Sequence, residues 1–486
     1  MNTKQYYLDT FRVSEENLKQ LIATALSGGG DYADLYFEYS TFNELVLRDS
    51  EVSSGGFHVD YGVGIRVLCG EKTGYAYSET TAMADMTAAA KAAAAIAAAS
   101  RGGAGAYCAA PAAGLPSRPA AGFYPVTESW RSLTADRLLP TLKTIEAQVR
   151  DRAAEIPDPG ISLEKVVVRL SSSESDILMY NSLGELSYDT RPMGSAMASA
   201  IFSKDGRTEQ KSASRSFRKG PSTFMSESLI GEISHETVRG IEDCFAASRP
   251  KGGKMPVVMG CGASGILLHE AMGHAFEADF NRKGQSVFSG RIGERVCRKG
   301  ISIVDDATVV GNRGACNWDD EGVPGQKTYM VRDGILESYL HDRISAAHYG
   351  VAPTGNGRRE SFRYNPIPRM RATYMESGDT EPSDIIAGVR KGIYVDEFRN
   401  GQVKIGEGDF TFYVKSGKLI ENGRLTAPIK DINIIGNGPE ALADILAAGN
   451  DLKLDNGTWT CGKDQSVPVC CGIPTVLVRS LTVGGD

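Results

Sequence analysis

Apolar positions in the first third of the chain follow two periods. Leu18, Leu21, Ile22 and Ala25 share one face of a helix that Ser14 can cap. Apolar and polar residues then alternate from about residue 33 to residue 77, which predicts strands, and the Ala-rich stretch 81–99 predicts a second helix. This region therefore combines helices with a sheet.

The middle of the chain also combines predicted helices with predicted strands. Residues 101–122 are rich in Gly, Ala and Pro and predict a flexible connection. Leu142, Ile145 and Val149 then mark a helix with Pro140 near its first turn. Residues 161–217 predict an antiparallel meander, followed by a helix over 226–244 and a Pro/Gly linker over 249–253.

The second half consists mainly of predicted strands. Asp333-Gly334 and Asn422-Gly423 are hairpin turn signals, and short helices are expected near 342–349 and 439–448. The fold class is therefore α+β, with an N-terminal half of antiparallel sheet and helices and a C-terminal half of hairpins and meanders. We expect an N-terminal α/β region (1–120), a middle helix plus antiparallel meander (121–248) and a C-terminal domain (249–486).

Composition limits the class of protein. With 486 residues and 41% hydrophobic content, the chain can form two or three globular domains. A net charge of −7 argues against nucleic-acid binding, and no signal segment or long apolar run predicts a membrane span. We expect a cytoplasmic protein. Nine cysteines without a Cys-x-x-Cys pair indicate neither a disulfide scaffold nor a zinc ribbon.

The main candidate for chemistry is a helical segment with two of the six histidines. His269 and His274 are five residues apart, and Glu270 follows the first. Imidazoles bind zinc, and a carboxylate beside the metal can take a proton from bound water. At 3.6 residues per turn the two imidazoles would point about 140° apart. We therefore predict a π-bulge or a break near Gly273.

Three other interpretations of this segment remain open. It could be a capped surface helix with two solvated histidines. Gly260, Gly262 and Gly265 fit a dinucleotide-binding turn, but the polar loop 279–285 stands where that fold needs a second strand. Glu270, His274 and Glu277 share one helix face and could form a carboxylate-rich metal site.

Further motifs follow the histidine segment along the chain. Together they are His269–His274, Phe280–Arg282, Ser286–Gly290, Asp319–Gly322, Pro353–Ser361, Gly449–Asp455 and Leu481–Gly485. This set resembles the TldD branch of the TldD/PmbA family. The resemblance is dense from about Gly260 onwards and looser before it.

The resemblance implies a cytoplasmic, zinc-dependent peptidase that cleaves unfolded or extended peptides, in precursor maturation and protein turnover. It implies that His269, His274 and Cys461 are metal ligands and that Glu270 is the catalytic base. From these donor types we expect one zinc ion per chain, with an open fourth position for water. It also implies a PmbA/TldE-like partner chain in a heterodimer, with a homodimer as the alternative. An older family label, modulator of DNA gyrase, does not suit the acidic composition.

Two parts of this assignment have alternatives. The family's Cys-Gly-Lys-acid run is one residue short here, because Gln465 directly follows Asp464, so Cys470 is a second candidate for the third ligand. His341, Arg358 and Arg359 are candidates for substrate binding, and each could instead be a surface or loop-structuring charge. The alternative function is a regulatory protein whose metal is structural and closed by four protein ligands.

Overall fold

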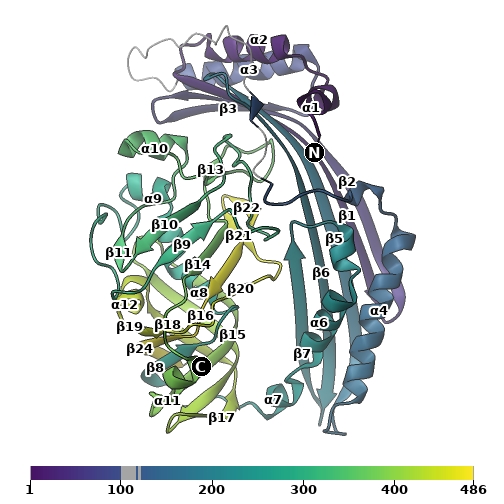
Figure 1. The fold of residues 1–486 in the computed structure, drawn as a ribbon, viewed down its shortest axis with the longest axis vertical. Helices are drawn as coiled ribbons and strands as arrows, with labels where there is room; N and C mark the ends of the chain where they lie inside the picture. The colour runs from purple at the N-terminus through teal and green to yellow at the C-terminus, as the bar shows by residue number, and fades with distance from the viewer. Residues whose placement is uncertain (1, 100–116, 119–121, 485–486) are drawn as a thin grey trace.

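The computed structural model describes residues 2–99, 117–118 and 122–484. A long curved sheet with helices on its outer face forms the N-terminal half, and a strand-rich C-terminal half lies against the other face (Figure 1). About 26% of the chain is helical and 42% is in strands. The prediction of an α+β fold is confirmed.

The N-terminal sheet has the strand order β3-β2-β1-β5-β6-β4, with β7 paired to β6. Strands β5, β6 and β7 pair antiparallel in sequence order, which confirms the meander predicted for residues 161–217, and β5 also pairs antiparallel with the distant strand β1. The bounds are β1 (Tyr32–Arg48), β2 (Glu51–Cys69), β3 (Lys72–Ser78), β4 (Ser117–Arg118), β5 (Ser162–Asn181), β6 (Leu186–Lys204) and β7 (Arg207–Phe217).

Alternation along β1 decides what each face of this sheet packs against. Leu35 and Phe37 belong to a core with three helices, and Leu45 and Leu47 belong to a second core with other helices. Tyr36 points to the opposite face and packs against Trp318 of the C-terminal half. The helices of this half are α1 (Lys4–Phe11), α2 (Glu15–Leu26), α3 (Met83–Ala99), α4 (Ala135–Ala154), α5 (Pro221–Phe224), α6 (Glu227–Val238), α7 (Ile241–Ala246) and the 3₁₀ turn η1 (Trp130–Ser132).

The C-terminal half contains a closed ring of five strands. Its order is β15-β8-β24-β18-β16, and β16 pairs back to β15. Val257, Ile393, Phe412 and Ile434 from four of these strands are fully buried in one core. The bounds are β8 (Gly253–Met259), β15 (Lys391–Val403), β16 (Asp409–Glu421), β18 (Ile432–Asn437) and β24 (Val476–Gly484), with β17 (Arg424–Ile429) and β19 (Ile445–Ala448) attached.

A second sheet, two short strand pairs and several short helices complete this half. The sheet order is β11-β10-β9-β14-β23-β20. Its strands are β9 (Ile303–Asp306), β10 (Lys327–Arg332), β11 (Ile335–Leu336), β14 (Ala372–Met375), β20 (Lys453–Asp455) and β23 (Cys470–Ile473). The pairs are β12 (Gly357–Arg358) with β13 (Ile367–Pro368), and β21 (Thr460–Lys463) with β22 (Gln465–Pro468). The helices are α8 (Gly265–Leu268), α9 (Ala278–Arg282), α10 (Arg343–Tyr349), α11 (Pro382–Ala387) and α12 (Gly438–Ala443), with the turns η2 (His269–Gly273) and η3 (His274–Phe276).

Several local predictions need correction. The helix expected over 226–244 is two helices, because the chain turns at Gly240 with φ 74°. The helix expected over 439–448 ends at Ala443 and continues as β19. Pro140 lies in the second turn of α4, which begins at Ala135. Most of the connection expected over 101–122 lies outside the described residues.

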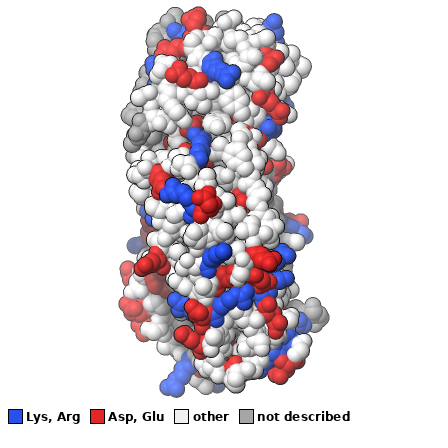
Figure 2. Space-filling model, turned by 90° about the vertical axis from the view of Figure 1, so that its right-hand side faces the viewer, with Lys and Arg blue, Asp and Glu red and all other residues white. Residues whose placement is uncertain are grey.

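Buried ion pairs join the two halves. Arg66 on β2 lies 2.6 Å from Glu321, and Arg191 on β6 lies 2.5 Å from Asp320. These contacts hold the loop between β9 and β10 against the sheet. None of the described helices is both long and apolar enough to cross a lipid bilayer. On the side shown in Figure 2, basic and acidic side chains are intermingled.

Candidate metal centre

The helix that carries the two histidines changes its winding at the first of them. It begins as α8 at Gly265, becomes a π-helical turn over His269–Gly273, and tightens to a 3₁₀ turn over His274–Phe276. The wider π turn compensates for the five-residue spacing. The predicted departure from a regular α-helix between His269 and His274 is confirmed.

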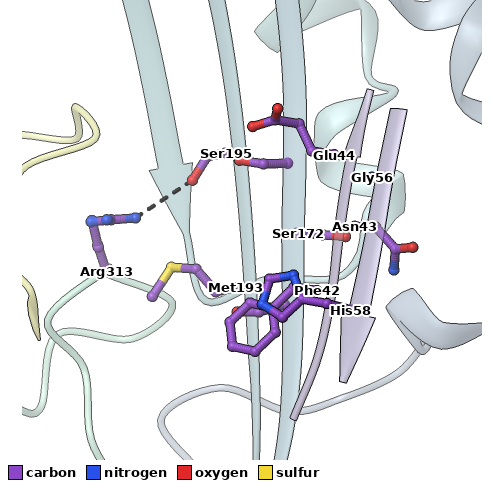
Figure 3. A pocket seen from close by; sticks show the side chains of 11 residues that line it. Phe42, Asn43, Glu44, Gly56, His58, Ser172, Met193, Ser195 and Arg313 are labelled. Atoms are coloured by element: carbon purple, nitrogen blue, oxygen red, sulfur yellow. Dashed lines mark hydrogen bonds between the residues drawn. The ribbon is translucent and has the colours of Figure 1, made fainter. Parts of the chain in front are cut away.

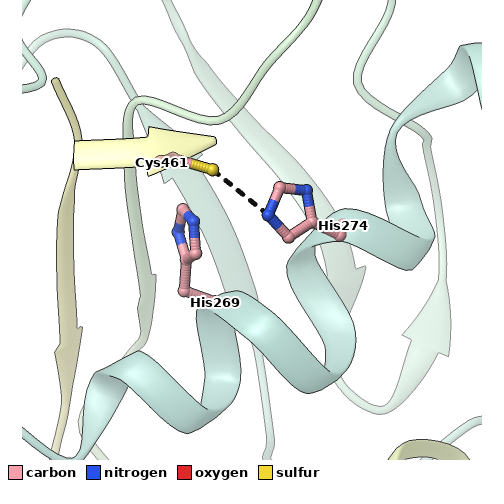
Figure 4. A group of neighbouring side chains, drawn as sticks. All are labelled: His269, His274 and Cys461. Atoms are coloured by element: carbon pink, nitrogen blue, oxygen red, sulfur yellow. Dashed lines mark hydrogen bonds between the residues drawn. The ribbon is translucent and has the colours of Figure 1, made fainter. Parts of the chain in front are cut away.

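This change of winding brings three donors together. His269, His274 and Cys461 each offer one ligand atom, and these atoms lie within 4.8 Å of one another (Figure 4). Cys461 Sγ is 3.1 Å from His274 Nε2, and the two imidazole centroids are 5.1 Å apart. All three side chains are at most 5% exposed.

Cys461 reaches the helix from a tight hairpin. Strands β21 and β22 pair from Thr460↔Pro468 to Lys463↔Gln465, and the chain reverses at Asp464 with φ 55°. The run that is one residue short therefore closes as a regular hairpin. Arg369 donates to the carbonyl oxygens of Cys461 (2.7 Å) and Gln465 (2.8 Å), which fixes both strands.

A buried carboxylate orients the second imidazole. Glu277 Oε2 lies 2.9 Å from His274 Nδ1 and accepts a hydrogen bond from Lys463 Nζ (3.0 Å). Burial alone would raise the pKa of Glu277, but Lys463 and His274 hold it well below its usual range. The ionised carboxylate accepts the Nδ1 proton, so Nε2, which faces Cys461, is the nitrogen left to bind a metal ion.

The imidazoles also set the state of the thiol. Burial alone would raise the pKa of Cys461, but His269, together with His274, lowers it to about 4. Burial alone would lower the pKa of His274, but Glu277 and Cys461 raise it to about 10. A thiolate is the form of cysteine that binds zinc.

The donor set fits a zinc ion. Both nitrogens of His269 are buried without a hydrogen-bond partner among the described residues, which is costly unless something else binds them. Two nitrogens and one sulfur are ligand types that zinc prefers, and three protein ligands leave a fourth position open. The described residues supply no fourth donor to this group.

Glu270 lies beside the group. Its Oε2 is 3.9 Å from His274 Nε2, and its side chain is 26% exposed. The carboxylate thus reaches both the donors and solvent.

The other candidate ligands are placed differently. Cys470 Sγ accepts from Asn312 Nδ2 (3.2 Å) and donates to the carbonyl of Asp455, so it is not part of the donor group. Glu277, a member of the alternative carboxylate site, contacts His274 through Nδ1 and is otherwise engaged by Lys463 and the Met370 backbone amide.

The three candidates for substrate binding make contacts within the fold. His341 is 4% exposed between Tyr339 and Tyr349, and burial lowers its pKa to about 4. Arg358 donates to the carbonyls of Met370 and Pro468. Arg359 donates to the Asp320 carbonyl and packs over Tyr36. A role in substrate binding stays a prediction for these residues.

Sequence reasoning missed Arg369, which holds the β21–β22 hairpin, and the role of Lys463 in fixing Glu277. Lys463 lies 186 residues after Glu277, so spacing alone could not pair them.

Comparison with known proteins places the chain in a family. Family models of the PmbA/TldA metallopeptidases match it in three parts: domain 1 over residues 33–97, the central domain over 128–242 and the C-terminal domain over 252–485. A metalloprotease TldD homolog from Haemophilus influenzae is 39% identical over 461 residues, covering 94% of this chain and 93% of that protein. The chain belongs to the TldD/PmbA metallopeptidase family.

More distant relatives include a zinc metalloprotease and two proteins of known structure. A zinc metalloprotease TldD homolog from Saccharolobus solfataricus is 34% identical and covers 53% of this chain and 57% of that protein. A modulator of a DNA gyrase from Thermotoga maritima has a TM-score of 0.73 at 20% identity, over 97% of this chain and all of that one. TldE from Thermococcus kodakarensis has a TM-score of 0.72 at 17% identity, over 96% of this chain and all of that one. At these identities the two structures show a shared fold.

Proposed function

We propose that this protein is a zinc-dependent peptidase that cleaves unfolded or extended peptides, with one zinc ion held by His269, His274 and Cys461. The observation that carries the proposal is the buried group of two imidazoles and one thiolate with no fourth protein donor among the described residues. A structural zinc would be closed by four protein ligands, so the open position favours catalysis over the regulatory alternative.

Each residue of the group has a distinct task in this mechanism. Zinc, when bound, lowers the pKa of a coordinated water toward about 7 and polarises the scissile carbonyl. Glu270, next to the donors and partly exposed, accepts the proton from the attacking water and passes it to the leaving amine. Glu277 keeps His274 in the tautomer that leaves Nε2 free. Because the thiolate lowers the charge of the site, we expect slow turnover.

Burial of the donors supports extended peptides as substrates. His269, His274 and Cys461 are at most 5% exposed, so a folded protein surface cannot reach them, and we expect the substrate to enter as a single extended strand. The test compares one polypeptide in its folded and unfolded forms. We expect cleavage of the unfolded form only, loss on chelation and recovery with added zinc. Equal cleavage of both forms would contradict this substrate class.

We further propose that the chain works in the cytoplasm with a TldE-like partner chain, or as a homodimer. Membership of the TldD/PmbA family supports this proposal. Light scattering of the protein purified with and without a co-expressed partner measures the mass of the complex. A monomer under both conditions would contradict the proposal.

A further inference from the structure

Arg313 points into a cavity between the two halves of the molecule. It lies on the loop between β9 and β10, and the cavity, of about 430 Å³, separates that loop from the inner face of the N-terminal sheet (Figure 3). Strands β1, β2, β5 and β6 supply the other walls, which include Phe42, Glu44, His58, Ser172, Met193 and Ser195.

The guanidinium group of Arg313 is buried without a counter-ion. The side chain is 8% exposed. It donates to Ser216 Oγ (2.5 Å), Ser195 Oγ (3.5 Å), Thr460 Oγ1 (3.4 Å) and the Trp459 carbonyl (3.0 Å), all neutral acceptors. No carboxylate of the described residues forms an ion pair with it. A buried charge of this kind is costly unless an anion compensates it.

A second buried arginine adds positive charge near Arg313 and so increases the need for a compensating anion. Arg218 is also 8% exposed, and its Nε has no hydrogen-bond partner among the described residues. Burial and the nearby charge of Arg218 lower the pKa of Arg313 to about 10. The one carboxylate in the cavity wall, Glu44, lies 3.4 Å from Arg169 and is therefore already paired.

The cavity adjoins the metal centre through one strand. Arg313 donates to Trp459 and Thr460, and Thr460 directly precedes Cys461 on β21. Successive side chains of a strand point to opposite faces. The guanidinium and the thiolate are thus fixed on two sides of the same strand, and an extended peptide spans about 3.3 Å per residue. A peptide that contacts both groups must therefore pass around the edge of the β21–β22 hairpin.

We propose that Arg313 is a specificity-determining residue that binds a carboxylate of the peptide substrate in this cavity, a few residues from the cleaved bond. The carboxylate is either the C-terminal group of the peptide or an Asp or Glu side chain. The planar guanidinium matches either one, and the stacked rings of Phe42 and His58 form an aromatic wall for the rest of the residue. The inference rests on the proposed peptidase function.

The test measures binding separately from cleavage. A series of fluorescein-labelled octapeptides carries Glu or Gln at one position, and this position differs from peptide to peptide. Each peptide is made with a C-terminal carboxylate and with a C-terminal amide. Their dissociation constants are measured by fluorescence anisotropy with the zinc-loaded, full-length Glu270→Gln protein, and cleavage with the wild-type protein. We expect one carboxylate position to bind about tenfold or more tightly than its neutral counterpart. Equal binding of all versions would overturn the proposal.

Two substitutions assign the preference to Arg313. Arg313→Gln removes the charge, and Ser195→Asp places a carboxylate of the protein itself beside Nη1. Each is expected to reduce the preference to less than threefold, while affinity for the neutral peptides stays near that of the parent protein. Arg137→Gln, on exposed α4, is the control and should leave the preference unchanged. A merely structural role would weaken charged and neutral peptides alike.

The outcomes also separate this proposal from the peptidase itself. Retention of the preference in Ser195→Asp would place the carboxylate elsewhere and overturn the assignment, even if Arg313→Gln does not fold. A carboxylate preference in binding without any cleavage would contradict the peptidase and leave the binding site. Cleavage without a carboxylate preference would support the peptidase function and overturn the binding site at Arg313.

Discussion

Cys461 and Cys470 are nine residues apart and equally buried, yet their thiols differ in acidity. Burial raises the pKa of Cys470 to about 12, and its sulfur contacts Asn312 and the Asp455 carbonyl. Cys461 is 4% exposed, but its neighbours are His269 and His274, and its pKa falls to about 4. The two neighbouring imidazoles, rather than exposure, therefore lower the pKa of Cys461, the proposed metal ligand, whereas Cys470 lacks such neighbours.

The same contrast explains why the third ligand was uncertain from the sequence. Cys461 lies in the β21–β22 hairpin and Cys470 follows it closely, so sequence position alone does not choose between them. The hairpin that reverses at Asp464 turns Cys461 towards the helix, whereas Cys470 lies on β23, whose neighbours are β14 and β20. Four substitutions test this contrast.

Cys461→Ala should have the largest effect, with loss of both bound zinc and peptidase activity. Two imidazoles without the thiolate hold zinc poorly, because one of three protein ligands is missing. Metal analysis of the purified protein and a peptide cleavage assay measure the two losses. Full zinc content and activity in this variant would show that Cys461 is not a ligand.

Glu270→Gln should reduce the rate of cleavage by roughly 10²- to 10⁴-fold, the usual contribution of a general base. Zinc content should stay near that of the wild type, because the carboxylate lies outside the donor group. Cleavage rates and metal content measured on the same sample distinguish a catalytic base from a metal ligand. Loss of zinc would instead identify Glu270 as a ligand.

Glu277→Gln should weaken zinc binding by about 10- to 100-fold, since the amide does not hold His274 as the carboxylate does. Competition with a chelator of known affinity measures the change. Asp279→Asn is the matched control: Asp279 accepts from Lys463 Nζ at 2.7 Å, as Glu277 does at 3.0 Å, and it forms no ion pair with His274. If the two substitutions weaken zinc binding equally, the effect comes from the lost contact with Lys463 and not from the contact of Glu277 with His274.

Cys470→Ala should have the smallest effect. It removes one of the two acceptors of Asn312 Nδ2, the other being Asn456 Oδ1, and leaves a small void, which lowers the free energy of unfolding by about 1 to 2 kcal/mol. Zinc content and peptidase activity should not change. Denaturant unfolding, with metal analysis on the same preparation, provides the measurement. A loss of zinc here would remove the contrast between the two cysteines.

Local signals in the sequence predicted local structure. Ser14 caps α2, and Asp333-Gly334 and Asn422-Gly423 form the two hairpin turns with positive φ at all four residues. The five-residue histidine spacing predicted the change in helical winding, because only the geometry of one helix was involved.

Long-range pairings could not be predicted in the same way. The ring depends on parallel pairing of β8 with β15, which are more than 130 residues apart and carry no signal for each other. The contact of Lys463 with Glu277 depends on that ring. The position of Arg313 against the N-terminal sheet depends on the junction between the two halves of the molecule. The third ligand came from family resemblance rather than from spacing. The division near residues 120 and 248 stays a prediction.

The separation of the donors along the chain has a consequence during synthesis. His274 leaves the ribosome 187 residues before Cys461, which corresponds to about 10 to 40 s at 5 to 20 residues per second. During that interval the nascent chain carries two histidines without their thiolate, and β24, which lies between β8 and β18 in the ring, has not yet been made. We therefore expect the growing polypeptide to be unable to hydrolyse itself or its neighbours until translation of the hairpin that carries Cys461 is complete.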